Sequence, residues 1–366
     1  MKIVISCGDP SGDVRSAELL EELKKLTHIE VSGFGGRYIQ KTGAEIMYSL
    51  QEFSIMGFTE VISSLGKLRK LRKGMRKHIL QTDPDIVLLV DYPGFNIPLA
   101  VWAKKQGYRV IYYISPQLWA WGRNRVKKIR SSTDLMITLF EFEVAFYRQH
   151  GVRAVCSGHP LADSIPVSLE SRPGSEIAYL PGSRRQEISQ LLKPMMDSFI
   201  ILRDRGVVSG AAVAVFPDIP AEFYERAKIT EGVRLVYSVK EALEKASAAV
   251  VCSGTATLET AMWGIPFIIA YKTSTLTYFL AKLLVKDLKY IGMANLVAGS
   301  LIATELIQKD ASPENIVRNI TPLLKDTALR EESLSRLKLV RKALGDSGSS
   351  RRAAERILEV IADDSA

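Results

Sequence analysis

One candidate catalytic carboxylate stands out because of the run that precedes it. Asp91 directly follows the apolar run Ile86–Val90 and opens the segment Asp91–Asn96. If that run is a buried parallel strand, Asp91 lies at its carboxyl end, where α/β sheets bind ligands. A carboxylate there could act on a substrate, and an aspartate that only caps the next turn fits the position equally well.

The segment Pro181–Glu187 has the composition of an anion-binding loop. Gly182 permits a tight turn, Ser183 and Gln186 have capping-box spacing, and Arg184 could bind a phosphate with its planar fork. A helix that begins here would point free N–H groups and a positive dipole end at a ligand. The segment therefore predicts a diphosphate cradle, and the alternative is an ordinary helix cap with two solvated arginines.

A second loop of this kind is Cys252–Glu259, which follows the run Ala248–Val251. Gly254 and Thr255 would let a helix N-terminus approach a phosphate closely. Glu259, one turn further on, could accept hydrogen bonds from the hydroxyls of a ribose. An acidic side chain that is simply favoured near a positive helix end is the alternative for Glu259.

Two basic segments suggest contact with an anionic surface. Gly66–Lys77 holds seven Lys or Arg and no acid. Apolar residues recur around it at three- or four-residue steps, as in an amphipathic membrane-surface helix: Val61, Leu65, Leu68, Leu71, Met75 and Ile79. A crossover helix packed on its own sheet gives the same pattern. Trp119 and Trp121 precede several arginines, and they could stack bases, lie at a lipid interface or pack in the core.

The elements that must position these loops alternate along the chain. Continuous apolar runs, typical of strands buried on both faces, alternate with helical patterns. These runs are Lys2–Ser6, Ile86–Val90, Arg109–Ile114, Asp134–Leu139, Glu176–Leu180, Ala211–Phe216, Ala248–Cys252 and Pro266–Tyr271. The pattern predicts an α/β protein with two doubly wound parallel sheets in tandem, residues 1–166 and 174–345, and a linker near 166–173. The tail, 346–366, contains a helical stretch that we expect to pack back on the first domain.

The composition of the chain indicates which classes of binding partner to expect. The chain has 366 residues, a formal net charge of +9 and 47% hydrophobic residues, which suits two packed domains with anionic partners. The three cysteines and four histidines show no metal-ligand spacing, and the loop Cys7–Asp13 lacks the dinucleotide fingerprint. We therefore expect no metal and no cofactor, and a hydrogen-bonded structural role for His159. No run is long enough to span a membrane, and we expect no signal peptide.

Taken together, the loops resemble the lipid A disaccharide synthases. The matching segments occur in the family's order over most of the chain: Ser11–Asp13, Ile55–Gly57, Glu60–Val61, Val90–Pro93 with Asn96, Tyr113–Pro116, Trp119–Trp121, Arg125–Ile129, Phe140–Glu143, Gly158–Asp163, Pro181–Arg184, Ser253–Glu259 and Asn295–Gly299. Asp9, Gln117 and Gly94 depart from the residues usual in the family, as does the pair Met293–Ala294.

This resemblance implies two Rossmann-like domains of the GT-B type and an inverting, metal-free glycosyltransferase. The donor would be UDP-2,3-diacylglucosamine and the acceptor 2,3-diacylglucosamine 1-phosphate, joined by a β-1,6 linkage with release of UDP. Asp91 would be the general base and Asp9 a second candidate or an orienting group. Arg184, Glu259 and Asn295 would contact UDP, with Gly182, Ser183, Gly254 and Thr255 near the diphosphate.

The acylated substrates imply a bacterial cytoplasmic enzyme that is peripheral on the cytoplasmic face of the inner membrane. The acceptor and membrane contacts would come from Met56, Val61, Leu65, Leu68, Leu71, Trp119 and Trp121. The resemblance leaves a homodimer open and favours no nucleic-acid partner. The alternatives are another UDP-hexosamine enzyme of this architecture, a 2-epimerase or a hexosaminyltransferase, and a basic nucleic-acid-binding protein.

Overall fold

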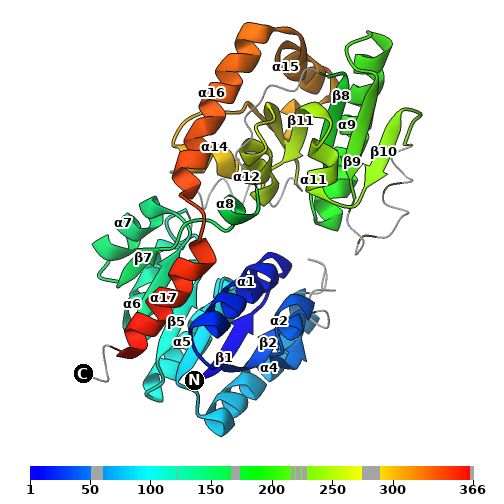
Figure 1. Cartoon of the computed structure of the whole chain (residues 1–366). Helices are drawn as coiled ribbons and strands as arrows, with labels where there is room; N and C mark the ends of the chain where they lie inside the picture. Colours follow the sequence, from blue (N-terminus) through cyan, green and yellow to red (C-terminus); the bar gives the residue numbers. More distant parts are fainter. Residues whose placement is uncertain are drawn as a thin grey trace. The chain divides into compact units, whose positions relative to one another are not determined.

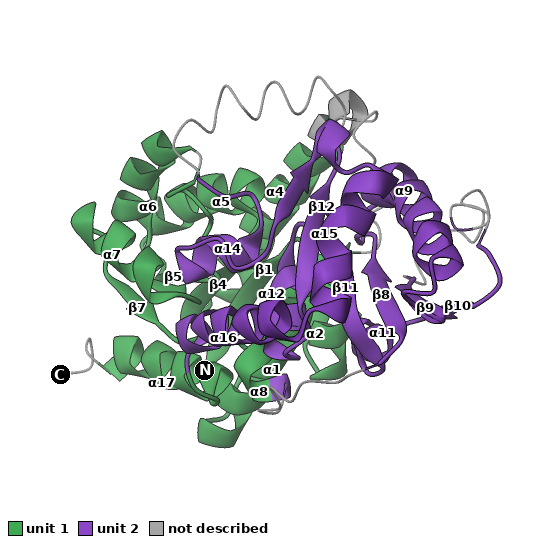
Figure 2. Ribbon diagram, turned by 90° about the horizontal axis from the view of Figure 1, so that it is seen from above, with its two compact units in different colours: residues 1–163, 346–366 green, residues 164–345 purple. Residues whose placement is uncertain are grey.

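Two compact units make up the chain (Figures 1 and 2). Unit 1 comprises Met1–Asp163 and Asp346–Ala366, and unit 2 comprises Ser164–Gly345. The computed structural model describes residues 1–50, 61–120, 122–165, 174–215, 219, 224, 229–273 and 289–362, with only the backbone of 61–65. The linker predicted at 166–173 lies outside these ranges.

The core of unit 1 is a parallel sheet of seven strands in the order β3-β2-β1-β4-β5-β6-β7. The strands are β1 (Lys2–Cys7), β2 (Glu30–Gly35), β3 (Glu45–Ser49), β4 (Ile86–Val90), β5 (Val110–Tyr113), β6 (Leu135–Thr138) and β7 (Ala154–Cys156). β1 pairs with β2 on one side and with β4 on the other. This order brings the loops after β1 and β4 to neighbouring places at the carboxyl edge.

Helices cover both faces of that sheet. They are α1 (Pro10–Leu26), α2 (Arg37–Lys41), α4 (Val61–Thr82), α5 (Pro93–Lys105), α6 (Val126–Ser132) and α7 (Glu141–Gln149), with η2 (Arg123–Arg125) and, at the boundary of the units, α8 (Leu161–Ser164). One apolar cluster joins α4, α5, α6 and α7 to the sheet through residues such as Met75, Phe95 and Ile129. This burial fixes the helices that carry the loops of the site.

The last helix of the chain, α17 (Ser349–Ala362), packs against α1 in unit 1, and Figure 1 draws it in red beside the blue α1. Asp163 holds its first turn, because its carboxylate accepts from the N–H groups of Gly348 and Ser349 and from Ser349 Oγ at 2.9 Å. Arg352 Nε adds a bond to Ser157 O at 2.9 Å. The Ser157–Asp163 segment therefore joins the chain end to unit 1.

Unit 2 repeats the plan with a parallel sheet of six strands in the order β10-β9-β8-β11-β12-β13. The strands are β8 (Glu176–Leu180), β9 (Gly210–Ala214), β10 (Val233–Val236), β11 (Ala246–Cys252), β12 (Phe267–Tyr271) and β13 (Glu305–Ile307). The helices are α9 (Arg185–Asp204), α11 (Val239–Leu243), α12 (Thr255–Met262), α14 (Met293–Ala298), α15 (Pro313–Lys325) and α16 (Thr327–Leu344), with η3 (Gln308–Asp310).

The observed sheets confirm the predicted fold class, and each of the eight predicted runs overlaps a strand. The apolar pattern did not predict the four edge strands, β3, β7, β10 and β13, nor β2, which pairs on both sides. β3 and β10 are largely half-buried or exposed, and β7 and β13 are only three residues long. Strands with one solvated side need no continuous apolar run, which explains the four edge strands. In β2, Ser32, Gly33 and Gly35 interrupt the apolar residues.

Candidate active site

Asp91 occupies a strained turn between β4 and α5. Asp91 has a φ of 41° and Tyr92 a φ of 47°, a left-handed conformation that side chains other than glycine adopt at a cost. Asn96 holds this turn, because its Nδ2 donates to Val90 O at 3.0 Å and to Asp91 O at 2.9 Å. Tyr112 contributes a further bond from its hydroxyl to Asp91 O at 2.6 Å. The turn is thus fixed by groups around it.

Electrostatics at this turn suit a proton acceptor. Burial, and next the negative charge of Asp9, raise the pKa of Asp91 to about 7, while the backbone N–H of Tyr92 acts in the opposite direction. A general base is most effective when its pKa lies near the working pH. Asp91 can therefore be ionised near neutral pH and still bind a proton.

Asp9 reaches the same edge of the sheet from β1. It caps α1, and its Oδ1 accepts from Gly12 N at 2.9 Å. Its neighbour Gly8 lies against the ring of Tyr92, since a Cβ on Gly8 would come within 2.1 Å of that ring. The loops after β1 and β4 therefore touch, and glycine is the residue that allows this approach.

Residues that sequence reasoning did not single out support this edge. Asn96 was recognised only as part of a motif, yet it also accepts from Ser6 Oγ at 2.7 Å and donates to Ser6 O at 3.2 Å. Asp13 is buried and accepts from the N–H groups of Gly36, Tyr38 and Ile39 at 2.8–3.2 Å, so that it caps α2. A polar residue within an apolar helix face is the signal that could have identified Asn96.

In unit 2, the loop after β8 turns at Gly182, whose φ of 108° favours glycine. Helix α9 begins at Arg185, so the predicted capping pair Ser183 and Gln186 is wrong by one position. Glu187 takes that place, because its Oε2 accepts from Ser183 N at 3.2 Å and Arg184 N at 3.3 Å. The N–H groups predicted to bind a diphosphate are thus engaged by a carboxylate.

Arg184 is an exposed cation of this loop. Its side chain is 82% exposed and its Nη1 lies 3.4 Å from Glu187 Oε1. Burial, and next the negative charge of Glu187, raise the pKa of the Cys252 thiol well above its usual value, and the positive charge of Arg184 acts in the opposite direction. The loops after β8 and β11, two adjacent strands, therefore lie in one electrostatic environment.

The loop after β11 starts helix α12 at Thr255, with Gly254 as its N-cap at a φ of 151°. Thr255 is exposed and Glu259 is partly buried. Thr257 ties this loop to α14, because its Oγ1 donates to Gly254 O at 2.8 Å and accepts from Ala294 N at 3.1 Å. The starts of α12 and α14 are therefore connected through Thr257.

Asn295 is not placed as a ligand contact. Its side chain is fully buried, its Nδ2 donates to Ala303 O and to Glu305 Oε1, each at 2.8 Å, and its Oδ1 accepts from the N–H groups of Ile302 and Ala303. Both donors and both acceptor positions of the amide are thereby used. Asn295 instead holds the 292–305 loop, with Glu305 accepting from Gly292 N at 2.8 Å.

Comparison with known proteins decides the family. The model of the lipid-A-disaccharide synthetase family matches residues 3–360. The lipid-A-disaccharide synthase of Trichlorobacter lovleyi is 35% identical over 98% of this chain and 97% of its own length. This chain belongs to the lipid-A-disaccharide synthetase family. It is therefore an enzyme, a glycosyltransferase of lipid A biosynthesis.

Solved structures agree on the fold of this family member. A UDP-GlcNAc 2-epimerase from Neisseria meningitidis bound to UDP-GlcNAc matches with a TM-score of 0.65 at 13% identity, covering 98% of this chain and 100% of that chain. The calicheamicin glycosyltransferase CalG4 matches with a TM-score of 0.63 at 13% identity, covering 99% and 98%. The architecture is the predicted GT-B type.

The predicted membrane contacts of this synthetase family member need correction. Leu71 is only 2% exposed and belongs to the unit 1 core with Met75 and Ile79, and Leu68 packs against the same core. The described part of the apolar stripe of α4, from Leu68 to Ile79, therefore packs on its own sheet, and Leu71 is unavailable to lipid. The side chains of Val61 and Leu65, and all of Met56 and Trp121, lie outside the described structure.

Part of the Trp119 side chain is held by contacts within unit 1. Its Nε1 donates to Glu143 Oε1 at 3.1 Å, and its ring packs edge-on against Phe142. Burial raises the pKa of Glu143 to about 7 against the hydrogen bonds that it accepts. His159 is also buried, accepts from Leu161 N at 3.1 Å, and has its pKa lowered to about 3 by burial. It is a neutral structural histidine.

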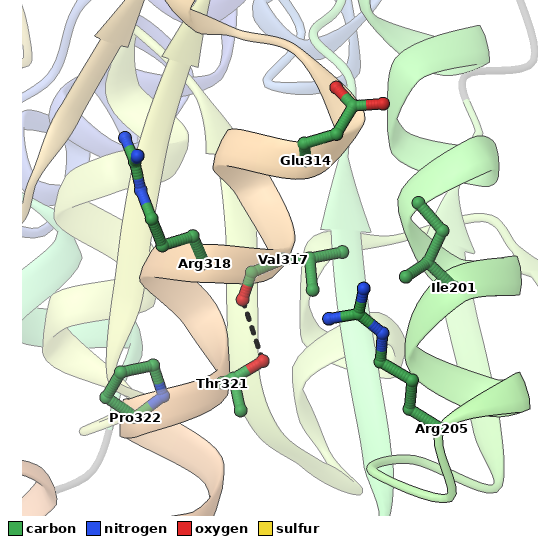
Figure 3. Close-up of a pocket in the computed structure, with 7 residues that line it drawn as sticks. All are labelled: Ile201, Arg205, Glu314, Val317, Arg318, Thr321 and Pro322. Carbon is green, nitrogen blue, oxygen red and sulfur yellow. Dashed lines mark hydrogen bonds between the residues drawn. The ribbon is translucent and has the colours of Figure 1, made fainter.

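Two further observations concern a pocket away from the predicted site and the search for metal ligands and membrane-spanning helices. Figure 3 shows a pocket of about 340 Å³ between α9 and α15, lined by Ile201, Arg205, Glu314, Val317, Arg318, Thr321 and Pro322, and it contains no predicted site residue. Within the described ranges, no group of His, Cys, Asp and Glu could hold a metal ion, and no helix is long and apolar enough to cross a membrane.

Proposed function

We propose that this enzyme transfers 2,3-diacylglucosamine from UDP to the 6-hydroxyl of 2,3-diacylglucosamine 1-phosphate, with inversion and release of UDP. The product is the β-1,6-linked lipid A disaccharide. Membership of the lipid-A-disaccharide synthetase family supports the disaccharide product. The Asp91 turn is the observation that carries the chemistry.

In the proposed mechanism, Asp91 accepts the proton of the 6-hydroxyl as its oxygen attacks the anomeric carbon from the face opposite UDP. The C–O bond to the diphosphate breaks as the new bond forms, which inverts the anomeric centre. A pKa of about 7 lets Asp91 hold that proton after transfer. Asp9 orients the acceptor and tunes Asp91 through its charge.

On the donor side, the departing UDP gains negative charge that the protein must offset. Arg184, the loop Gly182–Ser183 before α9, and the start of α12 at Gly254–Thr255 would supply positive charge and dipoles. The carboxylate of Glu187 would have to yield to the diphosphate. Glu259 would accept from the ribose, and Asn295 would position the loop rather than touch UDP.

The acyl chains imply that the enzyme works at a bilayer. We propose a peripheral position on the cytoplasmic face of the inner membrane. The exposed Lys and Arg side chains of α4, which include Lys67, Lys70 and Lys73, would bind anionic headgroups. This attraction is electrostatic, so we expect it to weaken as salt concentration rises.

The decisive assay measures UDP release from UDP-2,3-diacylglucosamine in detergent micelles, with and without the acceptor phosphate. We expect acceptor-dependent turnover that Asp91→Asn lowers by about 100-fold or more, because general-base catalysis contributes on that order. Asp85→Asn, at the other end of β4, is the control. Full activity of Asp91→Asn would refute the base, and epimerisation of UDP-N-acetylglucosamine without acyl chains would indicate a 2-epimerase.

A further inference from the structure

An arginine from α4 reaches the turn that carries Asp91. Arg72 Nη2 donates to Gly94 O at 3.3 Å, and its guanidinium lies 5.4 Å from the centre of the Phe95 ring. Phe95 in turn stacks on Tyr92, with ring centres 5.9 Å apart. Arg72 therefore lies beside the residues that follow Asp91, although it is remote in sequence.

A second arginine adds to the positive charge at this place. Arg76 follows Arg72 on the same face of α4, with its guanidinium 5.4 Å from the centre of the Trp102 ring. Burial, and next repulsion from Arg76 and Arg69, lower the pKa of Arg72. The Nε atoms of Arg72 and Arg76 are buried without a hydrogen-bond partner, and within the described ranges no carboxylate forms an ion pair with either.

Such an arrangement costs free energy unless an anion completes it. Partly buried guanidiniums that repel each other and leave donors unused gain most from a planar or tetrahedral oxyanion. The surface beside them is open, since a Cβ on Gly94 would meet no atom within 4 Å. The site therefore has charge, donors and space next to the proposed base.

We propose that Arg72, assisted by Arg76, binds the phosphate monoester of the acceptor sugar and so selects the acceptor. This inference rests on the proposed function. In that function the donor's phosphates belong to the loops of unit 2, so a second phosphate site in unit 1 would distinguish the two similar acylated sugars. The 1-phosphate of the acceptor is a monoester and carries about two negative charges. It therefore attracts the two guanidiniums more strongly than either phosphate group of the UDP donor, because both of those are esterified.

The test compares two acceptors in detergent micelles, one with the 1-phosphate and one with a free hydroxyl there. For the phosphorylated acceptor we expect Arg72→Ala to raise KM by about 10–100-fold, the range for a lost charge-assisted hydrogen bond. The donor KM and the turnover of the unphosphorylated acceptor stay near wild type. Lys105→Ala, which removes an exposed charge at the far end of α5, leaves all these values unchanged.

A second pair of variants tests the charge at position 72. Arg72→Lys keeps a positive charge on α4, and Arg72→Gln keeps a side chain of similar length without the charge. We expect Arg72→Gln to raise the same KM more than Arg72→Lys does. Equal effects of the two variants would overturn the proposal.

Vesicle binding separates the acceptor phosphate from lipid headgroups. If Arg72 only binds headgroups, Arg72→Ala should weaken flotation with phosphatidylglycerol vesicles more than Lys73→Ala does. It should also leave unchanged the KM for the acceptor measured in micelles. That pair of results would overturn the proposal. If both variants weaken flotation equally and only Arg72→Ala loses acceptor selectivity, the proposal stands. Wild-type protein inactive with either acceptor would refute the proposed function itself.

Discussion

Asp91 combines two destabilising features at one residue. Its backbone is left-handed and its carboxyl group is buried beside Asp9. Native proteins retain such features where the surroundings hold them in place, and here Asn96 and Tyr112 do so. The strain and the raised pKa are both properties that a base at a binding edge can use.

Replacing Asp9 by Asn should shift the pH dependence of turnover to lower pH. Ionised Asp91 is the active form, so activity rises with pH through its pKa of about 7. Removing the negative charge of Asp9 lowers that pKa, and Asn keeps the cap on α1 because its side-chain oxygen can still accept from Gly12 N. The measurement is kcat against pH from 5 to 9. An unshifted acid limb would mean that Asp9 does not act on Asp91.

Asp91→Asn should stabilise the fold in a pH-dependent way. The pKa of the Asp91 carboxyl is higher in the folded state than in the unfolded state. Its ionisation therefore lowers the free energy of unfolding as pH rises from about 4 to about 7, and this loss is complete above 7. The variant removes this loss, by up to about 4 kcal/mol at pH 8. Thermal melting at pH 4 and pH 8 measures it. A gain of equal size at both pH values would reflect only the ease with which Asn adopts a positive φ.

The sequence predicted the role of some single residues and not of others. The position of Asp91 followed from the apolar run before it, because that run is a central strand. The roles of Asn295 and Leu71 did not follow, since a loop amide and a helix leucine look alike whether they face a ligand, a lipid or the core. Only the partners in three dimensions separate those cases.

At the scale of helices and strands, the site depends on the order in which strands pair. β1 lies next to β4, and β8 lies next to β11, although each pair is far apart in the chain. The runs of apolar residues identified these four strands, and crossover geometry predicts their parallel pairing. The edge strands were missed because their exposed sides carry polar residues, and β2 was missed because Ser32, Gly33 and Gly35 interrupt its apolar residues.

The cap on α17 gives a prediction at this scale. Asp163→Ala removes the acceptor for the N–H groups of Gly348 and Ser349, and we expect a loss of about 1–2 kcal/mol. Amide hydrogen exchange in α17 should accelerate. Asp163→Asn retains an acceptor and should lose less, so equal losses in the two variants would show that charge rather than capping matters.

At the scale of the whole molecule, the two units carry different groups. The predicted nucleotide contacts belong to unit 2, while Asp9, Asp91 and Arg72 belong to unit 1. Such a division is common in folds with two doubly wound sheets, because each sheet presents its own edge of strand ends.

UDP binding tests this division. We expect Arg184→Ala to weaken UDP binding by about 10–100-fold, as for the loss of a charge-assisted bond. Asp91→Asn should leave the Kd unchanged, and Lys193→Ala, an exposed residue of α9, serves as the control. Isothermal titration calorimetry gives the three values. Weaker UDP binding in Asp91→Asn would contradict the division.

The return of α17 to α1 also has a consequence for synthesis on the ribosome. The surface of α1 that α17 covers is made early, but α17 itself is translated only after all of unit 2. At about 5–20 residues per second, the nascent first unit waits roughly ten to forty seconds with that surface uncovered. Unit 2 can fold while the first unit is still incomplete, so α17 completes unit 1 only after the residues of unit 2 have been made.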